Sequence, residues 1–340
     1  MRFYINLLST YYPGLDAPYA EYYRQVLEQV ELAEELGWEC FMFNEHHFLR
    51  YGGLIADPAI LLAAAASRTS RIRLGPCISI ITLRHPLQIA EQYAMVDAIS
   101  GGRLEFGIGS GNTDLDYRVF GIPRDESQSR LDEATGVIVK AWTHDRFSHR
   151  GKFWNFEEIT LYPRPRQQPH PPIWVAGTSP ATLGWAGRHG YDIMTVAHPH
   201  PPEAVKLGVD AWREALTAAG HDAASRRCQL HLRVYVDENT ERARDVAMAA
   251  IARYDEVATI GRKSASQVNL QGKAYDWEAM LASGRNCYGN PEQCIGIINN
   301  TMRNYEFDTL TTTFNFGGIP YEKILRSMRL FAKEVMPAFL

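Results

Sequence analysis

The chain has 340 residues, of which 46% are hydrophobic and 22% are charged, and its formal net charge is −4 at pH 7. These values are typical of a globular protein with a large core and exclude a disordered chain. A net charge of −4 with no block of Lys or Arg also argues against nucleic acid or an anionic membrane as the main partner, so we expect a small molecule.

The N-terminal segment RFYINLL carries one basic residue, and its apolar run is too short for a signal peptide, so it predicts a first strand. We find no later segment that is apolar for long enough to span a bilayer. The five cysteines are odd in number and include no CxxC pair, which is typical of free thiols in a reducing compartment. These features predict a cytoplasmic protein.

Short β-rich runs alternate with longer segments of helical period along the chain. The strands are predicted at 2–8, 39–43, 72–80, 103–109, 173–177, 192–196, 229–236 and 308–315. The helices are predicted at 19–36, 57–68, 86–99, 126–142, 180–189, 203–218, 239–253 and 291–304, with a final amphipathic helix after residue 320.

Eight alternations of strand and helix imply parallel strands joined by right-handed crossovers. We interpret them as one α/β domain over residues 1–340, a closed (β/α)8 TIM barrel. A doubly wound open sheet is the weaker alternative, because no GxGxxG motif opens a helix after the first strand.

Two segments are longer than a minimal barrel requires. Residues 143–172 precede the fifth strand, and their Pro-rich end predicts an ordered surface excursion rather than a helix. Residues 254–290 precede the last helix and the eighth strand. Because loops of this length in a compact fold are usually functional, we predict that this second segment is a mobile lid.

The first candidate site is Glu45, His46 and His47, which directly follow the apolar run CFMF. In a barrel, catalytic groups come from the C-terminal ends of the strands, and three ionisable side chains there are costly to desolvate unless they are used. An imidazole with a pKa near neutrality suits acid/base work. Taken alone, however, such a pair is more often one capping histidine and one packing histidine.

Two further strand ends carry glycines and hydroxyls. The segment GIGSGN, residues 107–112, leaves backbone N–H groups open where a flat ring or a phosphate could approach. The segment GTSP, residues 177–180, opens a helix with hydroxyls and a first-turn proline, which suits an anion. Each pattern alone is also explained by close packing or by an ordinary N-cap.

Together, the segments EHHFLRYGGLIADP, RHPLQIAEQYAMVDAISGGRLEFGIG and PIWVAGTSPATLGWAGRHG resemble the bacterial luciferase-like flavin-dependent monooxygenases. The resemblance covers nearly the whole chain and weakens across 197–290. It implies a barrel that takes up reduced FMN from a separate NAD(P)H-dependent flavin reductase. Dioxygen would add at the flavin C4a position, and the resulting (hydro)peroxide would oxidise a small organic substrate. Light emission is not implied.

The same resemblance assigns roles to individual residues. It makes His46 the acid/base and Glu45 the group that orients it or holds the strand end, with His47 as the weaker candidate. The family often has a non-proline cis peptide on the third strand. The cofactor-binding residues that it implies are Cys77 and Ile78 beneath the isoalloxazine, Gly109, Ser110 and Asn112 beside it, and Gly177, Thr178 and Ser179 at the phosphate.

The chain departs from the family at the phosphate. Luciferase α subunits carry a cysteine and an arginine where this chain has Gly109 and Ser110, and Gly177 replaces an acidic residue. The phosphate would therefore depend more on backbone N–H groups and hydroxyls. The candidate cations are Arg103, Arg118 and Arg188.

Three other functions remain open: a deazaflavin-dependent dehydrogenase of the same superfamily, a non-catalytic flavin-binding subunit and a metal-dependent hydrolase. The last is prompted by His198 and His200, but the first strand has no HxH and the Pro-rich context favours a loop, so we expect no metal.

The Ala-rich segment 57–68 is apolar on more than one side, which predicts a homodimer. Aromatic side chains that could line a substrate pocket or simply pack are Tyr11, Tyr12, Tyr51, Trp154 and Tyr162.

Overall fold

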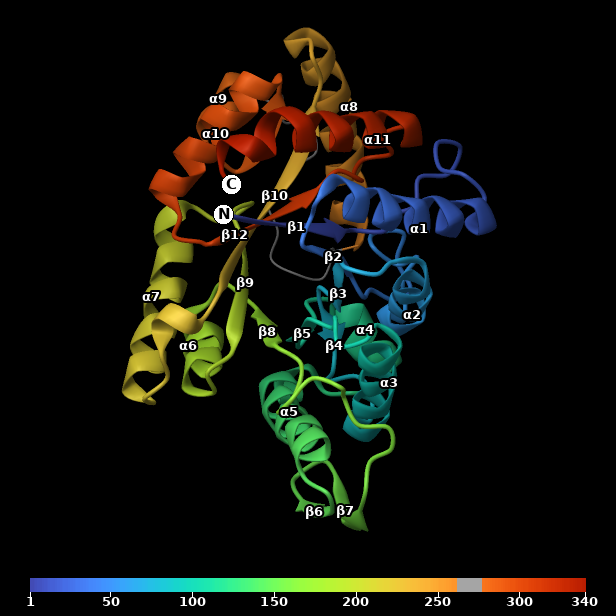
Figure 1. The fold of residues 1–340 in the computed structure, drawn as a ribbon, viewed down its shortest axis with the longest axis vertical. Coiled ribbons are helices and arrows are strands. Elements are labelled where there is room, and N and C mark those ends of the chain that lie inside the picture. The colour runs from blue at the N-terminus through green and yellow to red at the C-terminus, as the bar shows by residue number, and fades with distance from the viewer. Residues whose placement is uncertain (262–276) are drawn as a thin grey trace.

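A barrel of parallel strands organises the chain in the computed structural model, which describes residues 1–261 and 277–340 (Figure 1). Its strands run in the order β3-β2-β1-β12-β10-β9-β8-β5-β4, and β11 pairs with β10. Their bounds are β1 Arg2–Leu7, β2 Cys40–Phe43, β3 Arg73–Pro76, β4 Ser79–Ile80, β5 Phe106–Gly109, β8 Ile173–Ala176, β9 Asp192–Val196, β10 Cys228–Val236, β11 Asn286–Gly289 and β12 Thr309–Thr313.

The two ends of this strand order, β3 and β4, are successive pieces of one segment of chain. They are separated by Cys77–Ile78, whose peptide bond is cis. The Leu74 N–H donates to the Arg103 carbonyl at 3.0 Å, and the Glu105 N–H donates to the Leu74 carbonyl at 2.9 Å. Since β3 thereby bonds to the chain that enters β5, the ring is closed and the predicted barrel is confirmed.

Helices join the strands and surround the barrel (Figure 1). Four of them begin with a proline preceded by a capping side chain that accepts a backbone N–H, as the first-turn patterns predict. The helix bounds are α1 Tyr19–Leu36, α2 Pro58–Arg68, α3 Pro86–Ile99, α4 Asp114–Val119, α5 Ser127–Thr143, α6 Pro180–Arg188, α7 Pro202–Ala218, α8 Thr240–Gly261, α9 Trp277–Ala282, α10 Pro291–Asn304 and α11 Tyr321–Leu330.

Several details differ from the sequence prediction. The third strand is interrupted after Pro76, whereas the segment 72–80 predicts one strand. The excursion 143–172 is not helical, as predicted, but it contains an antiparallel hairpin of β6 (Phe147–Arg150) and β7 (Asn155–Ile159). The short helix α4 and the strand β11 were not predicted, because neither is long enough to show a hydrophobic period.

The predicted lid, 254–290, consists partly of regular elements. Residues 254–261 continue α8, and α9 and β11 lie between 277 and 289. The part of the prediction that concerns residues 262–276 lies outside the described residues. The lid and its mobility therefore stay a prediction.

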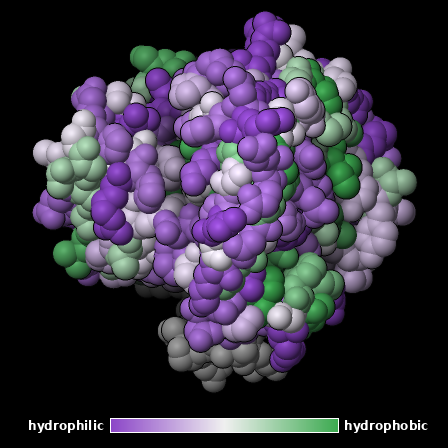
Figure 2. Space-filling model, turned by 90° about the horizontal axis from the view of Figure 1, so that it is seen from below, coloured by the Kyte–Doolittle hydropathy of each residue, from purple (hydrophilic) through white to green (hydrophobic). Residues whose placement is uncertain are grey.

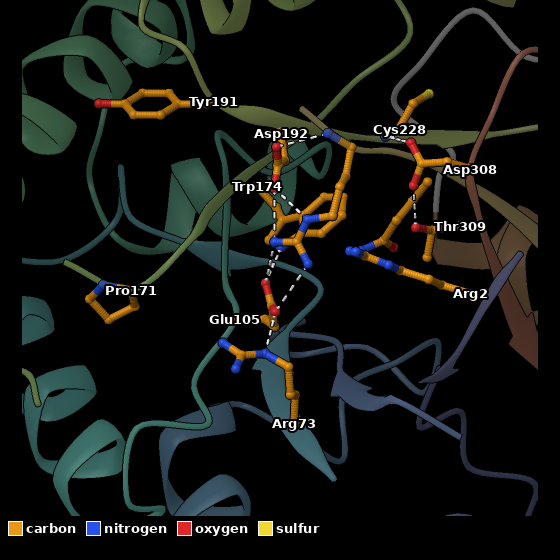
Figure 3. Close-up of polar contacts among 12 residues, drawn as sticks. Arg2, Arg73, Glu105, Pro171, Trp174, Tyr191, Asp192, Cys228, Asp308 and Thr309 are labelled. Atoms are coloured by element: carbon orange, nitrogen blue, oxygen red, sulfur yellow. Dashed lines mark hydrogen bonds and ion pairs between the residues drawn. The ribbon is translucent and has the colours of Figure 1, made fainter. Parts of the chain in front are cut away.

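The N-terminal end of the barrel is closed by buried charges (Figure 3). Glu105 precedes β5, and its carboxylate binds the Nε of Arg73, the Nη2 of Arg227 at 3.0 Å and the indole N–H of Trp174 at 2.6 Å. Arg227 also binds Asp192 at 2.9 Å. These residues come from five different strands or strand entries, so the cluster joins opposite parts of the barrel wall.

The outer surface carries charged and polar residues over most of the face in Figure 2, with smaller hydrophobic groups between them. Among the helices of the described residues, none is both long and apolar enough to cross a membrane.

Candidate functional site

Glu45 lies at the C-terminal end of β2, at the end of the barrel opposite Glu105, and only 2% of its surface is exposed. Its Oε1 pairs with the Nε2 of His47 at 3.2 Å. Its Oε2 accepts from the Ser79 hydroxyl at 3.1 Å and from the Ile80 N–H at 3.2 Å. The buried carboxylate is thus held by Ser79 and Ile80 of β4 and by His47, two residues further along the chain.

Arg84 adds a cation to this arrangement from the segment that follows β4. Its Nη2 lies 3.4 Å from Glu45, and its Nη1 binds Asp57 at 3.2 Å and Gln92 at 3.1 Å. Asp57 also caps α2, by accepting from the Ala59 N–H. The carboxylate is therefore linked to the N-terminus of α2 and to α3, which limits its movement.

His46 contacts Tyr51 and Gly52, which follow it in the chain. Its ring lies 5.3 Å from the Tyr51 ring in an edge-to-face arrangement, and it packs against Gly52, where a Cβ would overlap the imidazole. Gly52 has a φ of 70°, and its carbonyl accepts from Ser9 and Asn44 at 2.8 Å each. Glu45 is hydrogen-bonded to His47. Its role in orienting His46 or holding the strand end stays a prediction.

The glycines of β5 permit close approach between strands. A Cβ on Gly109 would lie 2.7 Å from the Ile78 side chain, and a Cβ on Gly107 would overlap the Pro76 carbonyl. Packing of β5 on β3 and β4 thus accounts for both glycines, and it places Gly109 directly against Ile78. The Ser110 carbonyl is held by the Tyr117 hydroxyl at 2.5 Å.

The segment Gly177–Ser179 leads from β8 into α6. The Ser179 Oγ accepts from the Thr182 N–H at 3.2 Å, so Ser179 is the N-cap. Ser179 is exposed and Thr178 is half-buried. An N-capped helix start with two hydroxyls and no acidic side chain is suited to a phosphate.

Two of the three candidate cations lie far from this helix start. Arg103 binds the carbonyls of Ala66, Thr69 and Ile72, at the C-terminal end of α2 and the entry to β3. Arg188 stands in the last turn of α6, about 13 Å along the axis from the N-cap. Arg118 is exposed on α4, directly after the segment 107–112.

Asp116 is a buried carboxyl beside the site that the sequence analysis did not identify. It lies on α4 and is 2% exposed. Burial raises its pKa to about 6, with His47 and Arg124 lowering the pKa and the charge of Glu45 raising it. Because α4 has only six residues, no sequence pattern indicated that this carboxyl would face Glu45 and His47.

A second set of polar groups lies on β10, on the interior side of the barrel. Gln229 accepts from the Thr311 hydroxyl, and the Nε2 of His231 lies 2.8 Å from the Thr313 hydroxyl. Burial and the neighbouring charge of Arg233 lower the pKa of His231 to about 4, so this imidazole is neutral at pH 7. Arg233 continues the same row toward the C-terminal end and is 6% exposed.

A surface pocket of about 250 Å³ opens between the segments that follow β1 and β2 and the helix α8. Two of the aromatic residues that could line a substrate pocket, Tyr12 and Tyr51, line this one. Two others do not: Tyr162 is 78% exposed, and Trp154 packs against His85. The pocket is lined by Tyr12, Pro13, Leu15, Leu49, Arg50, Tyr51, Arg253, Glu256 and Val257.

His198 and His200 follow β9. The His198–Pro199 peptide is cis, and the His200 carbonyl accepts from the Tyr305 hydroxyl at 3.3 Å. In the described part of the chain, no three His, Cys, Asp or Glu side chains gather as a metal site would require.

Comparison with known proteins gives consistent results. The family model described as luciferase-like monooxygenase matches residues 1–303. The chain is 33% identical over 188 residues to the oxygenase component of a flavin-dependent trigonelline monooxygenase from Acinetobacter baylyi, which covers 54% of this chain and 52% of that protein.

Two solved structures superpose over the full chain. Monooxygenase RslO1 from Streptomyces bottropensis has a TM-score of 0.92 and 31% identity, with 100% of both chains covered. The oxygenating constituent of 3,6-diketocamphane monooxygenase from Pseudomonas putida, in complex with FMN, has a TM-score of 0.82 and 21% identity over 100% of this chain and 99% of that chain. The second likeness concerns the fold alone.

Proposed function

Because this chain belongs to the luciferase-like monooxygenase family, we propose that it is an oxidoreductase that uses reduced FMN and O2 to oxidise a small organic substrate. The observation that carries the proposal is the convergence of three features at one end of the barrel. These are the imidazole of His46, the close contact of Ile78 with Gly109, and the helix start capped by Ser179.

The residues at this end fit FMN. The isoalloxazine would lie against Cys77 and Ile78 and beside Gly109–Asn112, and the phosphate would meet Gly177, Thr178 and Ser179 at the N-terminus of α6. Reduced FMN, when bound, supplies the electrons that activate O2.

The chain's own residues supply acid/base chemistry and shielding. His46 would hold or move a proton beside the cofactor. Glu45 would fix His47 and the end of β2, through its bonds to Ser79 and Ile80. Tyr51, which packs against His46, would help to exclude water.

We also propose that the reduced cofactor comes from a separate NAD(P)H-dependent reductase. The support is the 33% identical trigonelline monooxygenase, which is described as the oxygenase component of its enzyme. A site that collects its cofactor from a diffusing pool should bind reduced FMN more tightly than oxidised FMN.

A homodimer through α2 and α3 is a further part of the proposal. The two helices contact each other, and three large apolar side chains on them are exposed: Ile60 by 69%, Met95 by 51% and Ile99 by 48%. Exposed apolar groups on neighbouring helices are typical of an interface. Sedimentation should show a dimer at micromolar concentration, and Ile60→Glu should shift it to a monomer; a wild-type monomer would remove this part.

The central experiment compares cofactors under anaerobic conditions and then admits oxygen. Reduced FMN should bind markedly better than oxidised FMN or a reduced deazaflavin, and O2 should then be consumed with oxidation of an added organic substrate. Preference for the reduced deazaflavin would instead support the dehydrogenase. Binding of reduced FMN without turnover of any substrate in a broad screen would support the non-catalytic subunit.

A further inference from the structure

Arg233 is a buried cation that the proposed chemistry leaves without a role. It belongs to the interior row of β10, two residues beyond His231, while Leu230, Leu232 and Val234 face the outer core. The side chain is 6% exposed, and its Nη1 is buried without a hydrogen-bond partner. A guanidinium desolvated in this way is costly unless an anion or acceptor compensates it.

The neighbours of Arg233 within the described residues compensate its charge only in part. The guanidinium stacks on the Tyr254 ring, 4.5 Å from its centroid. Asp255, buried next to Tyr254 in the chain, is close enough for its negative charge to act on Arg233. Even so, the Arg233 Nη1 has no hydrogen-bond partner among residues 1–261 and 277–340. The aromatic face orients the guanidinium, and its outer N–H groups remain available.

Aromatic rings connect Arg233 to the proposed acid/base. The Tyr254 hydroxyl lies 2.9 Å from the Tyr51 hydroxyl, and the Tyr51 ring lies edge-to-face with His46. These residues come from α8, from the segment after β2 and from β10, so they form one wall across that part of the barrel mouth.

The proposed flavin residues lie on the other half of the barrel. Cys77, Ile78, Gly109 and Gly177 follow β3, β5 and β8, which are separated from β10 by β9 on one side and by β12, β1 and β2 on the other. His46 therefore stands between the flavin half and the Arg233 wall. A molecule against this wall would face the cofactor, which is the position of the substrate.

We propose that Arg233 binds an anionic oxygen of the substrate, and that the substrate is a planar aromatic carboxylate or phenolate packed against Tyr254 and Tyr51. This inference rests on the proposed function for the identity of the facing cofactor. Binding of the anion itself requires only Arg233 and the two tyrosines. A charge-assisted hydrogen bond in a buried site gives about 10- to 100-fold in affinity over an uncharged analogue.

The test uses benzoate and its uncharged isostere benzamide as probes, measured by calorimetry with the whole protein, with and without reduced FMN under anaerobic conditions. The wild-type protein should bind benzoate at least 10-fold more tightly than benzamide. Arg233→Met should abolish that preference and leave benzamide binding unchanged, and Arg233→Lys should retain part of it.

The matched control is Arg253→Met. Arg253 lies in α8 next to Tyr254, but its Nε donates to the Gly317 carbonyl at 2.6 Å, so this change should leave the benzoate preference intact. Equal wild-type affinities for the two probes would overturn the inference without any variant. A loss of reduced-FMN affinity in Arg233→Met, with benzoate binding unchanged, would also overturn it and place Arg233 against the flavin.

The two proposals fail separately. A wild-type protein that prefers benzoate but does not bind reduced FMN would retain the anion site and contradict the proposed cofactor. A protein that binds reduced FMN and shows no benzoate preference would retain the proposed function and contradict the anion site.

Discussion

The two ends of the barrel each bury a glutamate, and the partners of these glutamates differ in kind. Glu105 is 1% exposed and is bound by two arginines and an indole N–H (Figure 3). Glu45 is 2% exposed and meets a histidine, a hydroxyl, a backbone N–H and a guanidinium at 3.4 Å. Permanent cations hold the first carboxylate, whereas a side chain that can change its charge touches the second.

The partners of the two glutamates suggest different reasons for burying them: stability for Glu105 and the proposed chemistry for Glu45. A carboxylate held by two arginines and an indole N–H ties together the strands that carry them, so its end of the barrel is fixed. A carboxylate beside an imidazole contacts the type of side chain that acid/base chemistry uses most often. The N-terminal ends of barrel strands are generally used for stability and the C-terminal ends for chemistry, and we expect this chain to follow that division.

The largest expected effect is on stability at the Glu105 end. Glu105→Gln should lower the free energy of unfolding by about 3–5 kcal/mol, because the partly buried Arg73 would lose its carboxylate partner and Arg227 would keep only Asp192. Urea unfolding measures it. Glu45→Gln is the matched control and should cost less, because an amide oxygen can still accept from Ser79 and Ile80. Equal costs would remove the contrast between the two ends.

The next effect is on activity at the Glu45 end. His46→Ala should lower product formation by about 100-fold or more and raise peroxide release, while reduced-FMN affinity and stability change little. His47→Ala should mainly cost stability, since it removes the partner of Glu45 Oε1. Reductase-coupled assays and melting curves separate the two. If both variants lose activity together with flavin binding, the pair is structural.

A pH experiment tests the carboxyl beside this end. The folded-state pKa of Asp116 is about 6, raised mainly by burial, so the folded protein binds more protons than the unfolded chain between about pH 4 and pH 6. Its contribution to stability is lost as pH rises through that window. Asp116→Asn should therefore become more stable relative to wild type across pH 4–6, by about 2–3 kcal/mol at most, and level off above. A constant difference over this range would contradict the raised pKa.

The smallest expected effect concerns the phosphate. Ser179→Ala should cost about 1 kcal/mol of stability, since it removes the N-cap of α6. It should also lower the affinity for reduced FMN by roughly fivefold, because one expected hydrogen bond to the phosphate would be lost. Reduced riboflavin is the control, because it has no phosphate and its affinity should not change. An equal loss for both flavins would show that Ser179 acts only through the helix.

The barrel and the position of the site were predictable because they depend on local patterns. Alternating strand and helix periods predicted the barrel, and the strand ends predicted that Glu45, Gly109 and Ser179 would lie at one end of it. The cis bond at Cys77–Ile78 was expected from the family resemblance and is present. The break of the third strand, the hairpin of β6 and β7, and the short elements α4 and β11 were not predicted, because short segments show no clear period.

The sequence by itself determined the spacing of strands and helices, the proline and serine residues at which helices begin, and the end of the barrel at which polar residues gather. Only the tertiary structure decided which of these residues meet. Arg227 reaches Glu105 across 122 residues, Tyr51 reaches Tyr254 across 203, and Glu45 binds His47. The physical reason is that periodicity fixes the face of an element, whereas contacts between distant side chains depend on how the closed ring of strands brings those faces together.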